Sequence, residues 1–314
     1  MTAATSTARC LLCDHDQFVT LFPSTLSTVD APLRPEDCAC TNIGHKEHGP
    51  VVKCAHCGLA FIHPREDSRQ IVQAYEQVTD ELYAEEEHGR VLTFTRFLNH
   101  VERFRKPPGK LLDVGCHIGT FLRLARERSW EPYGVEPSRW AVEYARSKQG
   151  LNVRQGVAKD AQDFAVKFDL ITLIDVIEHV DDPLQELKDI RAILAPDGML
   201  VLTTMDFGSL FARITGKRWP WLMRMHLFYF TRDTMKKTLE TAGFETMHFS
   251  GYTHVVSFGY IIHKLASYSR TIAMVARAIA KPLQLNDVQV PINFGDFMTV
   301  VARPSRPSVH PKLD

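Results

Sequence analysis

The sequence predicts an α/β fold, in which a parallel sheet carries helices on both faces, behind a small N-terminal metal-binding segment. Two observations predict this arrangement. Apolar runs typical of buried strands alternate with helical patterns over residues 109–203, which is the order expected of consecutive βαβ units. Six of the seven cysteines lie in the first 57 residues, in a stretch with little hydrophobic periodicity that is too small to build much of a core.

The composition supports a folded protein and argues against some partners. The chain has 314 residues, of which 45% are hydrophobic and 24% charged, so global disorder is excluded. Its 37 Lys and Arg balance 37 Asp and Glu, whereas a dedicated nucleic-acid binder normally carries a basic domain. The sequence shows no secretory leader and no apolar run of membrane-spanning length, so a cytoplasmic location is expected.

Two cysteine pairs predict a structural zinc site. Cys10 and Cys13 form one C-x-x-C pair, and Cys54 and Cys57 form the other. Two such turns supply four thiolates, which leave no open position on a tetrahedral zinc ion. The alternatives are four unrelated cysteines or a redox C-x-x-C. A further alternative is that the C-x-C pair, Cys38 and Cys40, supplies ligands.

The chain divides into four parts on this reading. A zinc-binding segment (1–64) is followed by a helical bridge (65–108), a catalytic domain (109–303) and a disordered tail (304–314). The strongest boundary is the breaker Pro107-Pro108-Gly109.

The first half of the α/β core has clear local signals. A strand at 110–114 leads into a glycine turn and a helix at 120–128, and a second strand at 132–136 ends in Glu136. Ser138 caps the next helix, which Gly150 closes.

The second half continues the alternation. Asp182 caps a helix with Pro183 at its first position and Gln185 at the capping-box position. The other expected elements are a strand at 168–174, a turn at 196–198, a strand at 199–203, a helix at 231–242, a strand at 244–249, and a last, antiparallel strand at the sheet edge within 292–302.

The glycine turn does not fit a dinucleotide. A G-x-G-x-x-G fingerprint fails because His117 and Thr120 stand where glycines are needed. The pattern Asp113-x-Gly115-x-x-x-Gly119 instead suits a nucleoside with a short zwitterionic tail, and the carboxylate of Glu136 is placed to accept hydrogen bonds from both ribose hydroxyls.

These motifs resemble those of a known family. LLDVGCHIGTFL, YGVEPS, FDLITLIDVIEHVDDP and LAPDGMLVLTT resemble, in order, the motifs of class I S-adenosylmethionine (SAM)-dependent methyltransferases. The whole chain resembles the bacterial branch with an N-terminal zinc-binding segment, which includes sugar C-methyltransferases. The resemblance implies a Rossmann-like, seven-stranded sheet with SAM as the cofactor.

The resemblance also implies roles for individual residues. Asp113, Gly115 and Gly119 would line the methionine part of the cofactor, and Glu136 would bind the ribose. Two further acids complete the implied site, with Asp160 near the adenine and Asp175 facing the methionine end and the substrate. His117 stands where the commonest form of the motif has glycine, so its side chain must turn out of the loop.

Two histidines are candidate general bases for an acceptor that must lose a proton. His179 follows the strand at 168–174, and His226 lies in an aromatic segment that is typical of an active-site lid. Each is alternatively a hydrogen-bonded structural residue. The Glu178-His179 pair is also similar to metal-assisted O-methyltransferases.

Residues 255–280 form a basic amphipathic helix or helix pair. This stretch covers the substrate pocket, forms a dimer face, or contacts a membrane surface to reach a lipid-linked acceptor. The predicted function is SAM-dependent methyl transfer to a small molecule or sugar in glycan or natural-product biosynthesis. The alternatives are a catalytically inactive interaction protein with the same fold, or a nucleic-acid methyltransferase.

Overall fold

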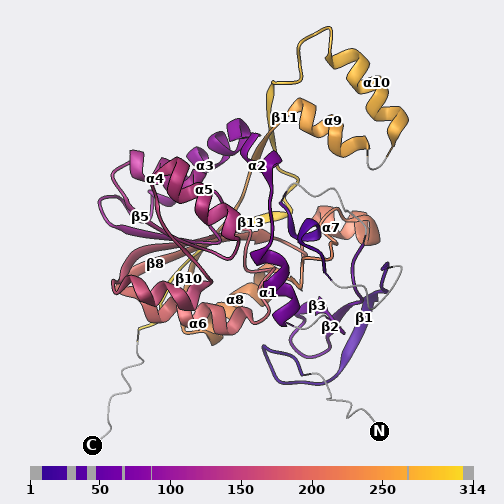
Figure 1. Cartoon of the computed structure of the whole chain (residues 1–314). Helices are drawn as coiled ribbons and strands as arrows, with labels where there is room; N and C mark the ends of the chain where they lie inside the picture. Colours follow the sequence, from indigo (N-terminus) through magenta and orange to yellow (C-terminus); the bar gives the residue numbers. More distant parts are fainter. Residues whose placement is uncertain are drawn as a thin grey trace, which may run out of the picture.

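The computed structural model describes residues 9–26, 33–40, 47–65, 68–85, 87–266 and 269–306. Its centre is a seven-stranded sheet in the order β10-β13-β8-β7-β4-β5-β6 (Figure 1). The strands are β4 (Lys110–Val114), β5 (Glu131–Glu136), β6 (Asn152–Gln155), β7 (Phe168–Ile174), β8 (Leu194–Met205), β10 (Phe244–Gly251) and β13 (Phe297–Pro304). Strands β4 to β8 run parallel to one another, and β13 is antiparallel to both β8 and β10. This confirms the predicted α/β sheet.

The last strand lies one place inside the sheet, which corrects the prediction that it forms the edge. Strand β13 is inserted between β8 and β10, so β10 is the edge strand. The reason is visible in their side chains: β13 is buried from Phe297 to Ala302, whereas in β10 only Phe244 is buried and the other residues are half-buried or exposed. A nearly continuous apolar run suits an inner strand that is covered on both faces.

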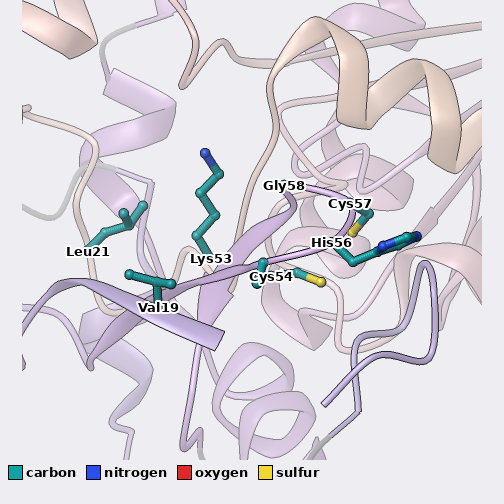
Figure 2. Close-up of a pocket in the computed structure, with 8 residues that line it drawn as sticks. Val19, Leu21, Lys53, Cys54, His56, Cys57 and Gly58 are labelled. Atoms are coloured by element: carbon teal, nitrogen blue, oxygen red, sulfur yellow. The ribbon is translucent and has the colours of Figure 1, made fainter. Parts of the chain in front are cut away.

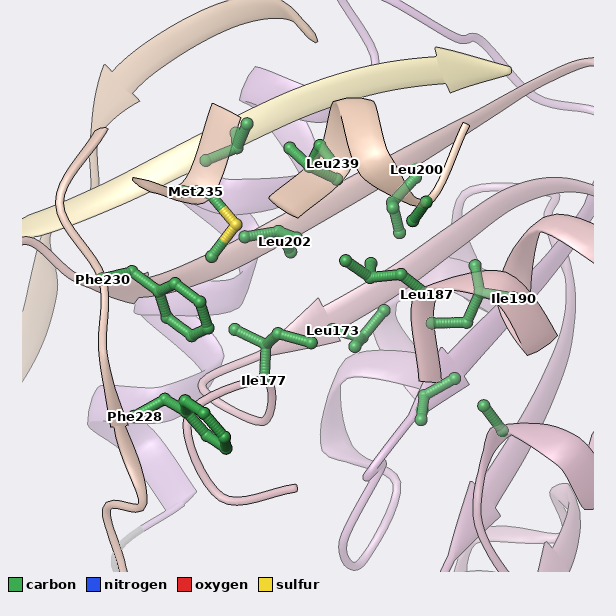
Figure 3. Packing of buried hydrophobic residues seen from close by; sticks show 14 of the residues in the cluster. Leu173, Ile177, Leu187, Ile190, Leu200, Leu202, Phe228, Phe230, Met235 and Leu239 are labelled. Atoms are coloured by element: carbon green, nitrogen blue, oxygen red, sulfur yellow. The ribbon is translucent and has the colours of Figure 1, made fainter. Parts of the chain in front are cut away.

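Helices cover both faces of the sheet. Helices α3 (Glu87–Val101), α4 (Thr120–Glu127) and α5 (Arg139–Gln149) lie on one face, and α6 (Pro183–Ile193) and α8 (Arg232–Thr241) lie on the other (Figure 1). Side chains of successive strand residues point to opposite faces of a sheet. Leu111 of β4 therefore packs in the core under α3, α4 and α5, and Leu112 packs in the core under α6 and α8. Figure 3 shows the second core, where Leu187 and Ile190 of α6 meet Leu200 and Leu202 of β8.

The local signals read from the sequence mostly hold. Ser138 Oγ accepts a hydrogen bond from the Ala141 amide at 3.1 Å, and Gly150 closes α5 with a φ of 61°. Asp182 caps α6 as expected, but Gln185 donates to Asp189 at 2.8 Å instead of reaching back to the cap.

The expected turn at 196–198 lies inside β8. This strand begins at Leu194, which pairs with Phe168, and pairing resumes with Met199 opposite Leu170. The residues between Leu194 and Met199 bulge out of the ladder, so the turn residues interrupt the pairing without ending the strand.

The N-terminal segment shares a sheet with the core. Strands β1 (Phe18–Phe22), β2 (Val51–Cys54) and β3 (Ala60–Ile62) continue into β9 (Phe228–Tyr229), which comes from the region after β8. The Ile62 amide also donates to the Leu227 carbonyl at 2.9 Å. Helices α1 (Ser68–Glu76), α2 (Glu81–Glu85) and α3 lead from this sheet to β4. The division at 64, 108 and 303 stays a prediction.

Residues 255–280 form a helix pair that stands away from the sheet (Figure 1). Strand β11 (His254–Ser257) leads into α9 (Phe258–Ala266) and α10 (Arg270–Ala280), and β12 (Gln289–Ile292) returns beside β11. Among the described residues, no helix is both long and apolar enough to cross a membrane. Of the predicted tail, Pro304 ends β13, and residues 307–314 lie outside the described part of the chain.

Short elements complete the chain. They are the 3-10 helices η1 (Pro35–Cys38), η2 (Ala158–Phe164) and η3 (Gly216–Arg218), and the helix α7 (Leu210–Thr215).

Candidate functional site

The glycine turn after β4 needs both of its glycines. Gly115 and Gly119 have φ angles of 74° and 83°, in the left-handed region. A Cβ would lie 2.6 Å from Val176 at Gly115 and 2.3 Å from Leu151 at Gly119. The turn is therefore held tightly against the segment after β7 and the start of β6.

Glu136, at the end of β5, is held by two backbone amides. Its Oε2 accepts from the His117 amide and its Oε1 from the Ser138 amide, both at 2.9 Å. The side chain is 6% exposed, and this burial raises the pKa of Glu136 to about 7, against the effect of the two backbone hydrogen bonds. The carboxylate is thus fixed beside the glycine turn.

Two more acids lie at the ends of neighbouring strands. Asp113 accepts from the Thr172 hydroxyl at 2.6 Å, and burial raises its pKa to about 7. Asp175, directly after β7, has a φ of 55° and accepts from the Thr203 hydroxyl at 2.6 Å, and burial raises its pKa as well. Both acids lie at the point where the strand order reverses around β4, which is where open α/β sheets bind ligands.

Asp160 has a structural role in this arrangement. Its Oδ2 accepts from the Val157 amide at 2.8 Å and so begins η2, which follows β6. Its predicted contact with adenine stays a prediction.

His117 turns out of the glycine loop, toward the bridge helices. Its ring lies 3.8 Å from that of Tyr83 in α2 and 5.9 Å from that of Trp140 in α5, measured between centroids. Burial lowers the pKa of His117 to about 4, so the ring is neutral at physiological pH.

The structure brings the two candidate bases together. The ring centroids of His179 and His226 lie 4.7 Å apart, although the two residues are distant in sequence. His179 Nδ1 lies 2.9 Å from the Tyr75 hydroxyl, and His226 Nδ1 lies 2.8 Å from the Trp221 carbonyl. Burial lowers the pKa of His179 to about 4.

The four cysteines predicted as ligands form one cluster. The Sγ atoms of Cys10 and Cys57 are 3.5 Å apart, as are those of Cys13 and Cys54, and all four lie within 4.8 Å of one another. Figure 2 shows two of them in the turn after β2, at the end of the β1–β2 pair. All four are free thiols, and the alternative ligand pair Cys38 and Cys40 lies outside this group.

The cysteine turn also provides a favourable thiolate. Burial works against ionisation, but hydrogen bonds from the backbone amides of Cys57 and His56 and from the thiols of Cys13 and Cys57 together outweigh it, so the pKa of Cys54 is lowered to about 7. Gly58 closes the turn with a φ of 82°, as the sequence predicts.

A family model described as a methyltransferase domain matches residues 83–248 of the chain. The chain belongs to the methyltransferase-domain family. The match includes the glycine turn, the three buried acids and both candidate bases.

Curated relatives resemble the chain over a shorter stretch. A ubiquinone biosynthesis O-methyltransferase of Histophilus somni is 33% identical over 107 residues, which cover 31% of this chain and 45% of the relative. A protein of the same name from Coxiella burnetii is 30% identical over 119 residues, covering 35% and 49%. The chain thus spans about half the length of these relatives.

Solved structures are similar at low sequence identity. A SAM-dependent methyltransferase of Thermotoga maritima, described as a possible histamine N-methyltransferase, is 20% identical with a TM-score of 0.47, covering 71% of this chain and 93% of its own. The fold assignment rests on the strand order of the seven-stranded sheet itself.

Sequence reasoning missed a cation near the glycine turn. The Arg90 guanidinium in α3 lies 3.7 Å from the Tyr83 ring centroid. Its Nε and Nη2 are buried and have no hydrogen-bond partner among the described residues. An unsatisfied buried charge is costly, so this position is suited to an anionic group of a ligand. Arginines are common on helices, and nothing in the sequence marks this one.

His254 was also missed. It is the first residue of β11, and its Nε2 lies 4.0 Å from Asp175 Oδ2. The surrounding rings of Tyr252 and Phe297 bury it, and this burial lowers its pKa despite the nearby carboxylate.

Proposed function

We propose that this chain is a SAM-dependent methyltransferase that acts on a small-molecule or sugar acceptor. The observation that carries the proposal is Glu136, a buried carboxylate fixed by two backbone amides beside the glycine turn. A carboxylate in this position can accept hydrogen bonds from the ribose hydroxyls. The family match supports the same cofactor.

The residues present fit SAM at both ends of the molecule. Asp113 and Asp175 offer negative charge to a ligand with a sulfonium and an ammonium group, and the unsatisfied Arg90 offers donors to its carboxylate. When bound, SAM supplies a methyl group already activated by the sulfonium. The site then has to exclude water, align the acceptor in line with the carbon–sulfur bond, and accept a proton where the acceptor carries one.

His226 and His179 are the residues we assign to the acceptor side. Their rings lie together, and His179 follows β7 shortly after Asp175, at the edge of the sheet where ligands bind. The relatives named O-methyltransferases favour a hydroxyl acceptor, and the resemblance to enzymes of glycan and natural-product biosynthesis favours a sugar or a related small molecule.

The cysteine cluster is assigned to a structural zinc ion. Four thiolates satisfy the tetrahedral preference of zinc completely. Zinc would stabilise the small β1–β2–β3 sheet, which has few core residues of its own.

The helix pair at residues 255–280 is assigned to contact with a membrane surface. Ile272, Met274, Val275 and Ile279 of α10 are 58%, 67%, 55% and 56% exposed, and Arg270 and Arg277 lie on the same helix. Apolar side chains flanked by arginines are typical of helices that lie in a lipid interface. Such contact would bring a lipid-linked acceptor to the site.

The decisive experiment combines binding and turnover. Calorimetry with SAM should show one site per chain, and incubation with a panel of nucleotide sugars and phenolic acceptors should release S-adenosylhomocysteine with one of them. Absence of SAM binding would refute the proposal. Binding without turnover on any acceptor would favour the inactive interaction protein, and turnover on RNA or DNA alone would favour the nucleic-acid methyltransferase.

A further inference from the structure

A second group of metal-ligand side chains lies apart from the cysteines. Glu178, His179 and His226 place a carboxylate oxygen and two imidazole nitrogens within 4.8 Å of one another. We propose that these three residues form a binding site for one divalent transition-metal ion. The site is distinct from the four-cysteine cluster in its residues and in its ligand chemistry.

The backbone holds the two halves of this site together. The amides of Leu227 and Phe228 both donate to the Glu178 carbonyl, at 2.8 and 3.2 Å. Beside these bonds, Ile177 packs with Phe228 and Phe230 in the core (Figure 3). His226 is therefore kept next to Glu178 and His179 by elements that do not depend on the three side chains themselves.

The orientation of both imidazoles suits metal binding. His179 Nδ1 lies 3.0 Å from the Met225 carbonyl, and His226 Nδ1 lies 2.8 Å from the Trp221 carbonyl. Because a carbonyl only accepts, each Nδ1 carries the proton of the neutral ring, and each Nε2 carries the lone pair. Metal-binding histidines usually donate their other ring nitrogen to a carbonyl or carboxylate in this way.

A hydrogen bond also orients the Glu178 carboxylate. Glu178 Oε2 accepts from the Thr204 hydroxyl at 2.9 Å, whereas Oε1 lies 3.9 Å from His179 Nε2. That separation is too long for a direct hydrogen bond, but it leaves room for an ion between the two atoms.

Glu178 is also buried without a cationic side chain beside it in the described part of the chain. The residue is 1% exposed and forms no ion pair with Lys or Arg among the described residues. Buried carboxylates are normally paired or coordinated to a metal. One carboxylate and two imidazoles leave positions open on a divalent ion for an external ligand.

The open positions suggest what the site does, and this part rests on the proposed function. An acceptor hydroxyl bound to the ion would lose its proton to water more readily, because a divalent ion lowers the pKa of a bound oxygen. The oxygen lone pair then forms the bond to the methyl carbon while the carbon–sulfur bond breaks, with its electron pair left on sulfur. His179 and His226 would act as ligands instead of bases, and the acceptor would be an oxygen nucleophile.

Manganese binding provides a direct test on the full-length, zinc-loaded protein. Mn²⁺ prefers oxygen and nitrogen ligands to thiolates, and electron paramagnetic resonance counts it without interference from zinc. The wild-type protein should bind about one Mn²⁺ per chain. Glu178→Gln and His226→Asn should each weaken this binding by roughly tenfold or more, whereas His248→Gln, at an exposed histidine of β10, should leave it unchanged.

The two variants keep the test independent of folding. Gln at position 178 still accepts from Thr204, and Asn at position 226 still offers an N–H to the Trp221 carbonyl, and circular dichroism checks that each variant is folded. A wild-type protein that binds no Mn²⁺ at millimolar concentration, or binding equal in all four proteins, would overturn the metal site.

A SAM titration of the wild-type protein separates this result from the proposed function. Mn²⁺ binding lost in the variants together with SAM binding in the wild type supports both proposals. SAM binding without Mn²⁺ binding overturns only the metal site, and Mn²⁺ binding without SAM binding overturns only the function assigned to it.

Discussion

Replacing Glu136 by Gln should weaken SAM binding and flatten its dependence on pH. Both carboxylate oxygens of Glu136 accept backbone amides. A glutamine offers one acceptor oxygen, so either His117 or Ser138 loses its partner, which costs about 1–3 kcal/mol for a buried donor. Loss of the charge also removes charge-assisted hydrogen bonds to the ribose, each worth about 1.5–3 kcal/mol. The expected result is a Kd raised by roughly 10- to 100-fold at pH 8.

The pH dependence follows from the raised pKa of Glu136, about 7 in the unbound protein. SAM requires the ionised carboxylate, which falls from about nine-tenths of the molecules at pH 8 to about one-tenth at pH 6. Wild-type affinity should therefore drop by about tenfold or more over this range. In the Glu136→Gln variant, only the pH dependence contributed by Asp113 should remain, because the pKa of Asp113 is also about 7.

Stability depends on pH in the same window. The folded protein binds the Glu136 proton more tightly than the unfolded chain does, because the pKa rises from 4.5 to about 7 on folding. The unbound protein should consequently lose stability as pH rises from about 4.5 to 7.

Calorimetry at pH 6 and pH 8 measures the binding prediction, with Glu131→Gln as the control on an exposed residue of the same strand. An affinity that is equal at both pH values, or that rises on acidification, would refute the reasoning. So would a Glu136→Gln variant that binds like the control.

Four other outcomes are expected. Arg90→Met should weaken SAM binding by about 10- to 100-fold. The melting temperature of the unbound protein should stay equal or rise, because the substitution removes an unsatisfied buried charge. A lower melting temperature with unchanged affinity would contradict this. Elemental analysis should give about one zinc per chain before any addition of metal, and a chelator that removes it should lower the melting temperature; a metal-free protein with the same stability would exclude the structural role. Gly119→Ala should destabilise the fold, because its Cβ would lie 2.3 Å from Leu151 and the φ is 83°, and denaturant unfolding measures this. Sedimentation with anionic vesicles should retain the wild-type protein and lose Ile272→Asp, and equal partition of both would argue against membrane contact.

The sequence was sufficient where the chemistry is local. Ser138, Gly150 and Asp182 act within one turn of the chain, so their spacing alone predicts the helix ends that the structure shows. Asp113 and Glu136 were predictable for a similar reason, because each ends or nearly ends a parallel strand, and such ends meet at one edge of the sheet.

The sequence does not predict which residues long-range packing brings together. The meeting of His179 with His226 depends on the hydrogen bonds from Leu227 and Phe228 to the Glu178 carbonyl, and on the pairing of β9 with β3. Neither has a signature in the spacing of the residues. The inner position of β13 is a different case, because its nearly continuous apolar run from Phe297 to Ala302 is a local signal for an inner strand that sequence reasoning missed.

The sheet that joins β3 to β9 makes the N-terminal segment part of the scaffold of the acceptor side. Strand β9 begins two residues after His226, and its partner strand is held by the turn that carries Cys54 and Cys57. Exchange of the N-terminal segment between related enzymes would therefore disturb the histidines along with the cysteines. In a cell short of zinc, acceptor processing would fail before cofactor binding does, because the glycine turn and Glu136 belong to a different sheet.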